Sequence, residues 1–297
     1  MTKQVSLYAF IQLRVSELRD SGKIRTAETY STMMNSIKRY LDGKDVPFRQ
    51  ITAELVNRYE NWLLTSGVSR NTSSFYIRIL RSVYNQAADR GFAPSANPFK
   101  HVYTGVDKTR KRAVSLDTIR RIKKMYLSYS PALSFARDMF LFSFYTRGMS
   151  FVDMAYLRRS DVHKNVLTYA RNKTGQTLSI RWEECMQEIV DRYPENPNGF
   201  LLPIITRPGD YRNQYRNVLF KVNSGLKEIS QLLNLPVPLT TYVARHSWAS
   251  IAYSQSVPLS VITEGLGHDS ERTTRIYLAS VLGDKVDRAN QMIIDLL

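Results

Sequence analysis

The segment NVLTYARNKTGQTLSIRW, residues 165–182, decides the fold more than any other stretch of this chain. Apolar and polar residues alternate on both sides of Asn172-Lys173-Thr174-Gly175, and such alternation around a short turn that contains glycine predicts a β-hairpin. The other long segments of the chain have the residue spacing of helices. The sequence therefore predicts a mainly α fold with a small β-sheet.

Helical segments flank this hairpin on both sides. Upstream, SLDTIRRIKKMYL is followed by PALSFARDMFLFSFYTRGMS, which is so apolar that it predicts a buried helix. Downstream, the periodicity predicts helices at residues 183–191, 211–233, 244–254 and 259–266. Residues 113–297 are therefore expected to form one mixed α/β domain with its sheet near the start.

Residues 1–103 predict a separate helical domain. An expected first helix near residues 5–19 is followed by three segments with apolar residues at i, i+3, i+4 and i+7. These segments are TAETYSTMMNSIKRYLDG, the stretch from Leu55 to Leu63, and NTSSFYIRILRSVYNQAADRG. Short connections between helices are typical of a bundle, and we expect the aromatic stripes to form its core.

Residues 104–112 differ from the regions on either side. Gly105 interrupts helix, and four of the five residues 108–112 are Lys or Arg. This composition predicts a basic linker between the two domains. Two interpretations fit it equally, a solvated run of charge and a strap that lies along a phosphate backbone.

The net charge indicates the kind of partner. The chain has 42 Lys and Arg residues against 26 Asp and Glu residues, which gives a formal charge of +16. Because both expected domains share this excess, a long polyanion such as double-stranded DNA is favoured over a small phosphate. A basic protein without a nucleic-acid partner is the alternative.

Composition excludes several other classes of protein. The single cysteine, Cys185, excludes an internal disulfide framework and a zinc site with several thiolates. The N-terminus lacks a signal-peptide pattern and the chain has no long apolar run, so we expect a cytoplasmic protein. Asp138, Asp153 and Asp161 lack the spacing of metal ligands, and we expect neither a metal nor another cofactor.

Five residues of the second domain could carry chemistry. Near the C-terminus, EGLGHDSERTTRIYLAS places Tyr277 nine residues after His268, a helical spacing that fits a packed tyrosine as well as a nucleophile. Three cations precede this pair. They are Arg147 at the end of the buried helix, Lys173 in the hairpin turn and Arg245 at the start of a helix.

The order of these residues carries a resemblance. With TTYVARHSWAS around Arg245 and LGH before Tyr277, the chain resembles the catalytic domain of the tyrosine recombinase (phage integrase) family. The expected helical domain resembles that family's SAM-like core-binding domain, so the resemblance covers nearly the whole chain. It implies a site-specific DNA recombinase that works through a covalent 3′-phosphotyrosine, in integration, excision or inversion.

The chemistry of such a reaction explains the residue types. A phenol can form a phosphodiester that conserves the energy of the broken bond, which implies that Tyr277 is the nucleophile. A guanidinium stabilises the charge that develops on the phosphate oxygens, and this is the role implied for Arg245. The resemblance implies that Lys173 protonates the departing 5′ oxygen. It also implies that His268 hydrogen-bonds the phosphate or exchanges a proton with Tyr277.

Two positions depart from the pattern of the family. Tyr242 stands where most members have histidine, and its phenol can hydrogen-bond a phosphate oxygen but is a poor base near neutral pH. In the first-arginine motif, T-G-x-R-x-x-E, alignment of Asp153 with the acidic residue places Ser150 at the arginine. The chain resembles a subset that reads R-G-M here, and we expect Arg147, about one helical turn earlier, to replace that arginine.

The resemblance also implies an assembly. We expect a homotetramer on two recombination sites, with accessory DNA-bending proteins as further partners and the bacterial nucleoid as the place of action. A C-terminal helix would either dock on the neighbouring subunit or cover its own core. Its expected apolar face consists of Met292, Ile293, Leu296 and Leu297.

Two other functions are alternatives to recombination. The altered first-arginine and histidine positions also fit a catalytically degenerate integrase-like protein that binds DNA without cleaving it. A type IB topoisomerase would use similar chemistry, and it would relax supercoiled DNA without a preference for particular sites.

Overall fold

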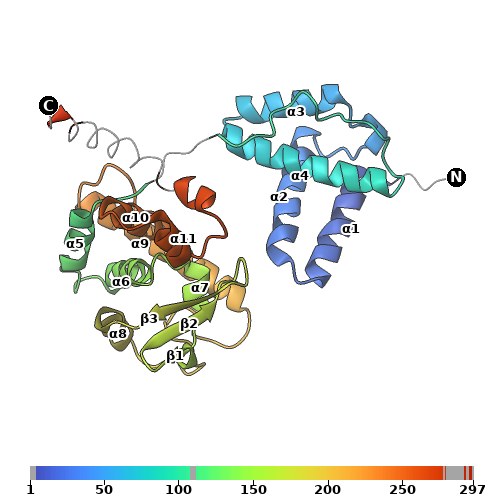
Figure 1. Ribbon diagram of the computed structural model, residues 1–297. Helices are drawn as coiled ribbons and strands as arrows, with labels where there is room; N and C mark the ends of the chain where they lie inside the picture. Colours follow the sequence, from blue (N-terminus) through green and yellow to red (C-terminus); the bar gives the residue numbers. More distant parts are fainter. Residues whose placement is uncertain (1–4, 108–111, 277, 279–290, 292–293, 296–297) are drawn as a thin grey trace. The chain divides into compact units, whose positions relative to one another are not determined.

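The computed structural model describes residues 5–107, 112–276, 278, 291 and 294–295. The chain divides into two compact units, Met1–Thr109 and Arg110–Leu297, and each is considered by itself (Figure 1). In the described part of the chain, no helix has both the length and the apolar character needed to span a bilayer. Several residues singled out above lie outside the described residues: Tyr277, most of the cations of the expected linker, and Met292, Ile293, Leu296 and Leu297.

The described part of the first unit contains four α-helices, which confirms that this region is helical. They are α1 (Leu7–Asp20), α2 (Ile24–Tyr40), α3 (Ala53–Thr65) and α4 (Arg70–Asp89), with a short 3-10 helix at Phe48–Gln50. Thr52 and Ser69 begin α3 and α4, because their hydroxyls accept hydrogen bonds from backbone N–H groups of the first turn.

Aromatic side chains form the centre of this bundle. The ring of Phe48 meets Phe10 at 5.5 Å between centroids and Tyr84 at 6.1 Å, both edge to face. Tyr59 is fully buried, and its hydroxyl donates to Ser36 Oγ at 2.8 Å. The aromatic stripes of these helices therefore serve the core.

The second unit is mainly helical with one small sheet, which confirms the expected fold class. Its helices are α5 (Leu116–Lys124), α6 (Pro131–Tyr145), α7 (Phe151–Tyr156), α8 (Glu184–Asp191), α9 (Tyr211–Leu232), α10 (Thr241–Ser254) and α11 (Leu259–Leu266). A short 3-10 helix, Arg159–Asp161, precedes strand β1. The strands are β1 (Val162–His163), β2 (Val166–Ala170) and β3 (Thr177–Arg181).

Helix α6 forms the centre of this unit. Its side chains Phe140 and Phe142 have no exposed surface, as the apolar sequence predicts. Figure 1 shows α6 between the helices α9 and α10 on one side and the sheet with α8 on the other. The end of this buried helix therefore places the residues that follow it, Thr146 to Ser150, in the interior of the unit.

The sheet is antiparallel, in the order β1-β2-β3. Leu167 pairs with Ile180, and both side chains are buried, whereas the neighbouring pair Thr168 and Ser179 is exposed. A sheet with one covered face requires this alternation, since successive side chains of a strand point to opposite faces. The turn between β2 and β3 contains Lys173, as the sequence predicts.

The start of α10 differs from the sequence prediction. The helix begins at Thr241 rather than at residue 244, so Arg245 lies one turn inside it instead of at its start. Apolar periodicity could not reveal this first turn, because Thr240, Thr241 and Tyr242 show no apolar stripe. The consequence is that Tyr242 and Arg245 share one helix, three residues apart.

Asp138, on α6, has a structural role. Its carboxylate is 1 % exposed and accepts hydrogen bonds from Arg137 Nε at 3.0 Å, Arg192 Nη1 at 2.8 Å and the Tyr193 hydroxyl at 2.9 Å. A buried charge persists only when it is paired and hydrogen-bonded in this way. Within the described residues, no group of three His, Cys, Asp or Glu side chains is arranged to hold a metal ion.

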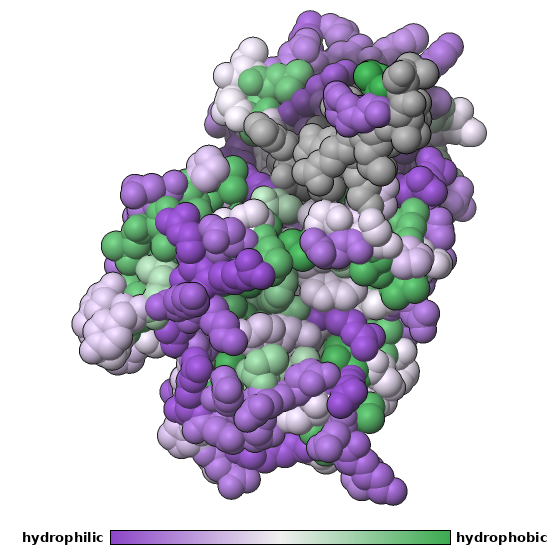
Figure 2. All heavy atoms as spheres, turned by 60° about the vertical axis from the view of Figure 1, so that its left-hand side comes forward, coloured by the Kyte–Doolittle hydropathy of each residue, from purple (hydrophilic) through white to green (hydrophobic). Residues whose placement is uncertain are grey.

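The surface is strongly polar on the face that Figure 2 shows. Hydrophilic residues cover most of this face, and hydrophobic residues form small, separated patches. Such a surface fits the formal charge of +16.

Candidate active site

A pocket of about 440 Å³ brings together several of the expected site residues. Lys173, Tyr242, Arg245 and His268 line it, although they come from the β2–β3 turn, from α10 and from the segment after α11. Tyr277, the expected nucleophile, lies outside the described residues. The pocket thus unites residues that are far apart in the sequence.

Arg245 is the most deeply buried cation of this pocket, at 5 % exposure. Its guanidinium donates to the carbonyl oxygen of Gly148 at 2.9 Å and to that of Leu266, and its Nη2 atom lies 3.0 Å from His268 Nε2. Two carbonyl groups from distant segments therefore fix the plane of the guanidinium. A group held in this way can stabilise charge on a phosphate without rearranging first.

Gly148 is the residue that allows this approach. Its φ is 77°, and a Cβ atom at this position would lie 2.5 Å from the Cα atom of Arg245. The turn after α6 is closed by the Gly148 N–H, which donates to the Ser143 carbonyl at 2.7 Å. Both the left-handed backbone and the close contact require glycine, which explains the glycine of the R-G-M sequence.

His268 is held as a neutral ring. Burial, the largest cause, and the cations Arg245, Arg171 and Lys173 lower the pKa of His268 to about 4. Because a guanidinium can only donate, the Nε2 atom that faces Arg245 accepts, and Nδ1 carries the proton toward Thr274 Oγ1 at 2.9 Å. His268 Nε2 is therefore the unprotonated ring nitrogen, and its one lone pair accepts from Arg245.

The turn that carries Lys173 is anchored on its α7 side. The Gly175 N–H donates to the Arg171 carbonyl at 2.8 Å and closes the turn. The Asn172 N–H donates to Asp153 Oδ1 at 2.8 Å, and the Ser150 hydroxyl donates to Asp153 Oδ2 at 2.7 Å. Lys173 itself is exposed, so its ammonium extends from a fixed base.

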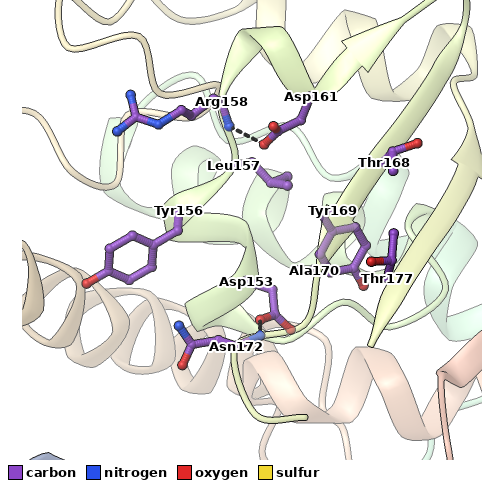
Figure 3. Close-up of a pocket in the computed structure, with 10 residues that line it drawn as sticks. All are labelled: Asp153, Tyr156, Leu157, Arg158, Asp161, Thr168, Tyr169, Ala170, Asn172 and Thr177. Carbon is purple, nitrogen blue, oxygen red and sulfur yellow. Dashed lines mark hydrogen bonds between the residues drawn. The ribbon is translucent and has the colours of Figure 1, made fainter. Parts of the chain in front are cut away.

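A second pocket, of about 360 Å³, lies on the other side of Asp153 (Figure 3). Figure 3 shows the Asp153 carboxylate directed at the backbone N–H of Asn172, next to the ring of Tyr169. Burial, the largest cause, raises the pKa of Tyr169 to about 12. Tyr169 is 8 % exposed and belongs to the core of the unit, so it supports the hairpin.

Arg147 lies at the edge of this arrangement. Arg147 is not among the described residues that line the larger pocket, whereas Ser150 is. Its Nη1 atom is 3.5 Å from the Ser179 carbonyl oxygen on β3, the outer limit of a hydrogen bond. Its φ is 60°, a left-handed conformation that costs a non-glycine residue about 1 kcal/mol.

Tyr242 stands at the mouth of the pocket. Its side chain is 49 % exposed, and its ring packs edge to face on His246 with 4.9 Å between centroids. Residues three apart on a helix lie on the same side, so Tyr242 and Arg245 face one space. The phenol can therefore reach a group that Arg245 binds.

Comparison with known proteins identifies the family. Residues 6–104 match the family described as phage integrase SAM-like domain. The chain is 25 % identical over 234 residues to tyrosine recombinase XerD of Halalkalibacterium halodurans, covering 77 % of each protein. The chain is therefore similar to tyrosine recombinases over most of its length. The resemblance carried by the motifs and their order is therefore confirmed.

Solved structures show that the fold is that of tyrosine recombinases. A lambda integrase dimer bound to a COC′ core site superposes with a TM-score of 0.69 and 17 % identity, over 92 % of this chain and 77 % of that one. A lambda integrase tetramer bound to a Holliday junction gives 0.68 and 17 %, over 93 % and 78 %. The expected combination of a SAM-like domain and a mixed α/β domain is confirmed.

The sequence analysis missed Arg171, which also lines the pocket of about 440 Å³. Leu167 and Tyr169 form the buried face of β2, and residue 171 is the next position on that face. A cation at an inward register position was the available signal, since charged residues are seldom buried without a partner. Thr274, the partner of His268, was also missed, and nothing in the sequence marks it.

Gly148→Ala should lower the free energy of unfolding of the protein more than Gly209→Ala does. Both glycines have φ near +75°, so both variants incur a backbone cost of about 1 kcal/mol. A Cβ atom at residue 148 would also meet the Arg245 backbone, whereas one at residue 209 would meet no described atom within 4 Å. Urea unfolding measures the difference, and equal losses would contradict this account of Gly148.

His268 should titrate near pH 4 in the DNA-free protein, against about 6.5 in the unfolded chain. Between these values the unfolded chain binds a proton that the folded chain excludes, so the free energy of unfolding falls as the pH falls from about 6.5 to 4. Side-chain NMR gives the midpoint. His268→Asn should weaken this pH dependence, and a midpoint near 6.5 would refute the assignment.

Proposed function

We propose that this tyrosine recombinase carries out site-specific recombination of duplex DNA by transferring one strand at a time to Tyr277. The observation that carries the proposal is the pocket in which Arg245, His268 and Lys173 converge although 23 or more residues separate each from the next. In the chain, Tyr277 follows His268 by nine residues and Thr274, which contacts His268, by three. This short connection supports Tyr277 as the attacking group.

The reaction conserves a phosphodiester in each step. The phenol oxygen of Tyr277 bonds to phosphorus while the bond from phosphorus to the 5′ oxygen breaks, and the electron pair of that bond goes to the 5′ oxygen. The phenol proton passes to His268 Nε2, and Lys173 Nζ protonates the 5′ oxygen. The products are a 3′-phosphotyrosine and a 5′ hydroxyl. Attack by a 5′ hydroxyl reverses the step and releases Tyr277.

Charge stabilisation by Arg245 is the main contribution of the pocket. As Tyr277 attacks, negative charge concentrates on the non-bridging oxygens of the phosphate. The Arg245 guanidinium is buried and held by two carbonyl groups, so it acts in a medium of low dielectric without reorganising. Its planar donors suit two phosphate oxygens at once.

Nε2 is the unprotonated nitrogen of His268, so it is the ring atom that would take the phenol proton of Tyr277, in exchange for its hydrogen bond from Arg245. In the DNA-free site burial, the largest cause, and three cations lower the pKa of His268 to about 4, which makes the ring a weak base. A bound phosphodiester adds a negative charge beside the ring, which raises that pKa again. DNA binding would therefore prepare His268 for its role.

Tyr242 and Arg147 would complete the binding of the phosphate. The exposed phenol of Tyr242 shares one side of α10 with Arg245 and would donate a hydrogen bond to a non-bridging oxygen. The bond from Arg147 to Ser179 is long, at 3.5 Å, so leaving it costs little. Arg147 also holds a strained backbone conformation, and such outliers occur preferentially at functional sites.

Recombination requires two DNA sites and four active sites. The lambda integrase structures to which this chain is similar are a dimer on a core site and a tetramer on a Holliday junction. We propose a homotetramer of the same kind for this chain, with the C-terminal segment docking on a neighbour and accessory DNA-bending proteins as further partners. Whether the outcome is integration, excision or inversion depends on how the two sites are arranged.

Covalent capture tests the proposed function. The wild-type protein, incubated with nicked duplexes that tile the DNA flanking its gene, should form an adduct that resists denaturation. Tyr277→Phe should form none, because it lacks the attacking oxygen. Tyr126→Phe, which changes an 81 % exposed tyrosine of the same unit, should form the adduct normally.

Three outcomes would contradict the proposal. An adduct formed by Tyr277→Phe would exclude Tyr277 as the nucleophile. Specific binding by the wild-type protein without cleavage would favour the degenerate DNA-binding alternative. Relaxation of supercoiled DNA without any site preference would favour the topoisomerase.

Arg147→Ala should slow single-turnover cleavage by about 100-fold, since removal of one transition-state donor typically costs that much. Arg181→Ala removes the same charge from the same unit, at an 82 % exposed side chain on β3, and should retain most of the activity. Cleavage rates are measured on the duplex recovered by covalent capture. Equal rates for the two variants would show that Arg147 does not replace the missing arginine.

A further inference from the structure

We propose that Arg171 is a positioning residue that fixes the Lys173 turn to the C-terminal end of α11. The inference rests on the proposed function, because it assumes that Lys173 protonates the 5′ oxygen. Arg171 would act through Lys173 by keeping the ammonium at a constant distance from the phosphate that Arg245 binds.

The guanidinium of Arg171 joins two segments that are 96 residues apart. Its Nη1 atom donates to the carbonyl oxygen of Gly267, the residue that ends α11. The backbone of Arg171 closes the lysine turn as well, because its N–H donates to the Gln176 carbonyl at 2.9 Å and its carbonyl accepts from the Gly175 N–H at 2.8 Å. One residue therefore shapes the turn and attaches it to α11.

The contact between the hairpin and Gly267 is close. A Cβ atom at residue 267 would lie 2.9 Å from Leu178 Cδ1, 3.0 Å from Arg171 Cδ and 3.0 Å from Gln176 Oε1. Gly267 also has φ of 62°, so its backbone favours glycine, and these side chains leave little room for a Cβ atom. The stem of Arg171 packs against the end of α11, in addition to the hydrogen bond of its guanidinium.

This attachment complements the one from α7. Asp153 holds the N–H of Asn172 on one side of the turn, and Gly267 holds the side chain of Arg171 on the other. Lys173 and Thr174, which follow directly, are exposed. The turn is therefore fixed at its base by two anchors, while the reactive ammonium extends into the pocket.

The same corner of the chain also holds the phosphate-binding groups. The carbonyl of Leu266 accepts from Arg245, the carbonyl of Gly267 accepts from Arg171, and His268 comes next in sequence. Two guanidinium groups thus bind adjacent carbonyl groups of one backbone corner. Arg171 links the proton donor of the leaving group to the same corner that positions Arg245 and His268.

The test uses a leaving group that needs no proton. In a duplex with sulfur in place of the 5′ bridging oxygen, the leaving thiol has a pKa near 8.5 and departs as a thiolate without general acid help. The duplex is the one recovered by covalent capture, prepared with oxygen and with sulfur. Adduct formation is followed in single turnover for the wild type, Lys173→Ala and Arg171→Gln.

We expect Arg171→Gln to slow cleavage of the oxygen substrate at least 10-fold, because general acid catalysis contributes 100-fold or more and depends on position. On the sulfur substrate the loss should shrink to about 2-fold, as for Lys173→Ala. A purely structural defect would slow both substrates alike. Arg181→Gln, a matched change at an exposed arginine of the same sheet, should behave as the wild type on both.

A second variant keeps the test decisive if Arg171→Gln does not fold. Arg171→Lys retains the stem and the charge but loses the planar donor group, and it should show the same dependence on substrate with a smaller loss. Equal slowing on both substrates would overturn the inference and favour direct contact between Arg171 and the phosphate. Unchanged cleavage of the oxygen substrate would overturn it too.

Failure of the proposed function has a different signature. If sulfur did not restore cleavage by Lys173→Ala, Lys173 would not be the acid, and the inference would fall with that assignment. If sulfur restored Lys173→Ala but not the Arg171 variants, the role of Lys173 would stand and the inference alone would fail.

Discussion

The hydrogen bonds from Arg245 to the carbonyl oxygens of Gly148 and Leu266 are the interactions on which the candidate site depends. A buried guanidinium is costly unless its donors are satisfied, and these acceptors come from positions 97 and 21 residues away. The end of α6, the second turn of α10 and the end of α11 must therefore meet at one point. The pocket lies where these segments meet, and Arg245 is part of its lining.

Two glycines make this meeting possible at close range. Gly148 and Gly267 both have positive φ, and a Cβ atom at either would overlap a neighbouring arginine, Arg245 or Arg171. Backbone carbonyl groups thus hold both guanidinium groups, and backbone dipoles are fixed by the fold. Lys173 is the exception, since its long side chain extends from an anchored turn. A fixed arginine and an extended lysine suit a reaction in which charge stabilisation must be rigid while the proton donor must follow a leaving group.

Much of the fold and part of the site could be predicted from the sequence, for physical reasons. The expected helices at 183–191, 211–233 and 259–266 agree with α8, α9 and α11 within one residue, because apolar periodicity marks each of them. Residue order and spacing also indicated four side chains that line the pocket. Arg171 could not be found in this way, because its importance arises from a contact with Gly267 that exists only in the folded chain.

The charges around the site make proton transfer from tyrosine depend on a bound phosphodiester. Arg171, Lys173 and Arg245 repel one another in the free protein, and together with burial they keep His268 neutral. A phosphodiester that enters the pocket reduces this repulsion between the three cations, and that reduction favours its binding. The same anion raises the pKa of His268 and makes it a better acceptor for a phenol proton. Proton transfer from a tyrosine is thus coupled to the presence of the phosphate it would attack, which disfavours reaction in the absence of DNA.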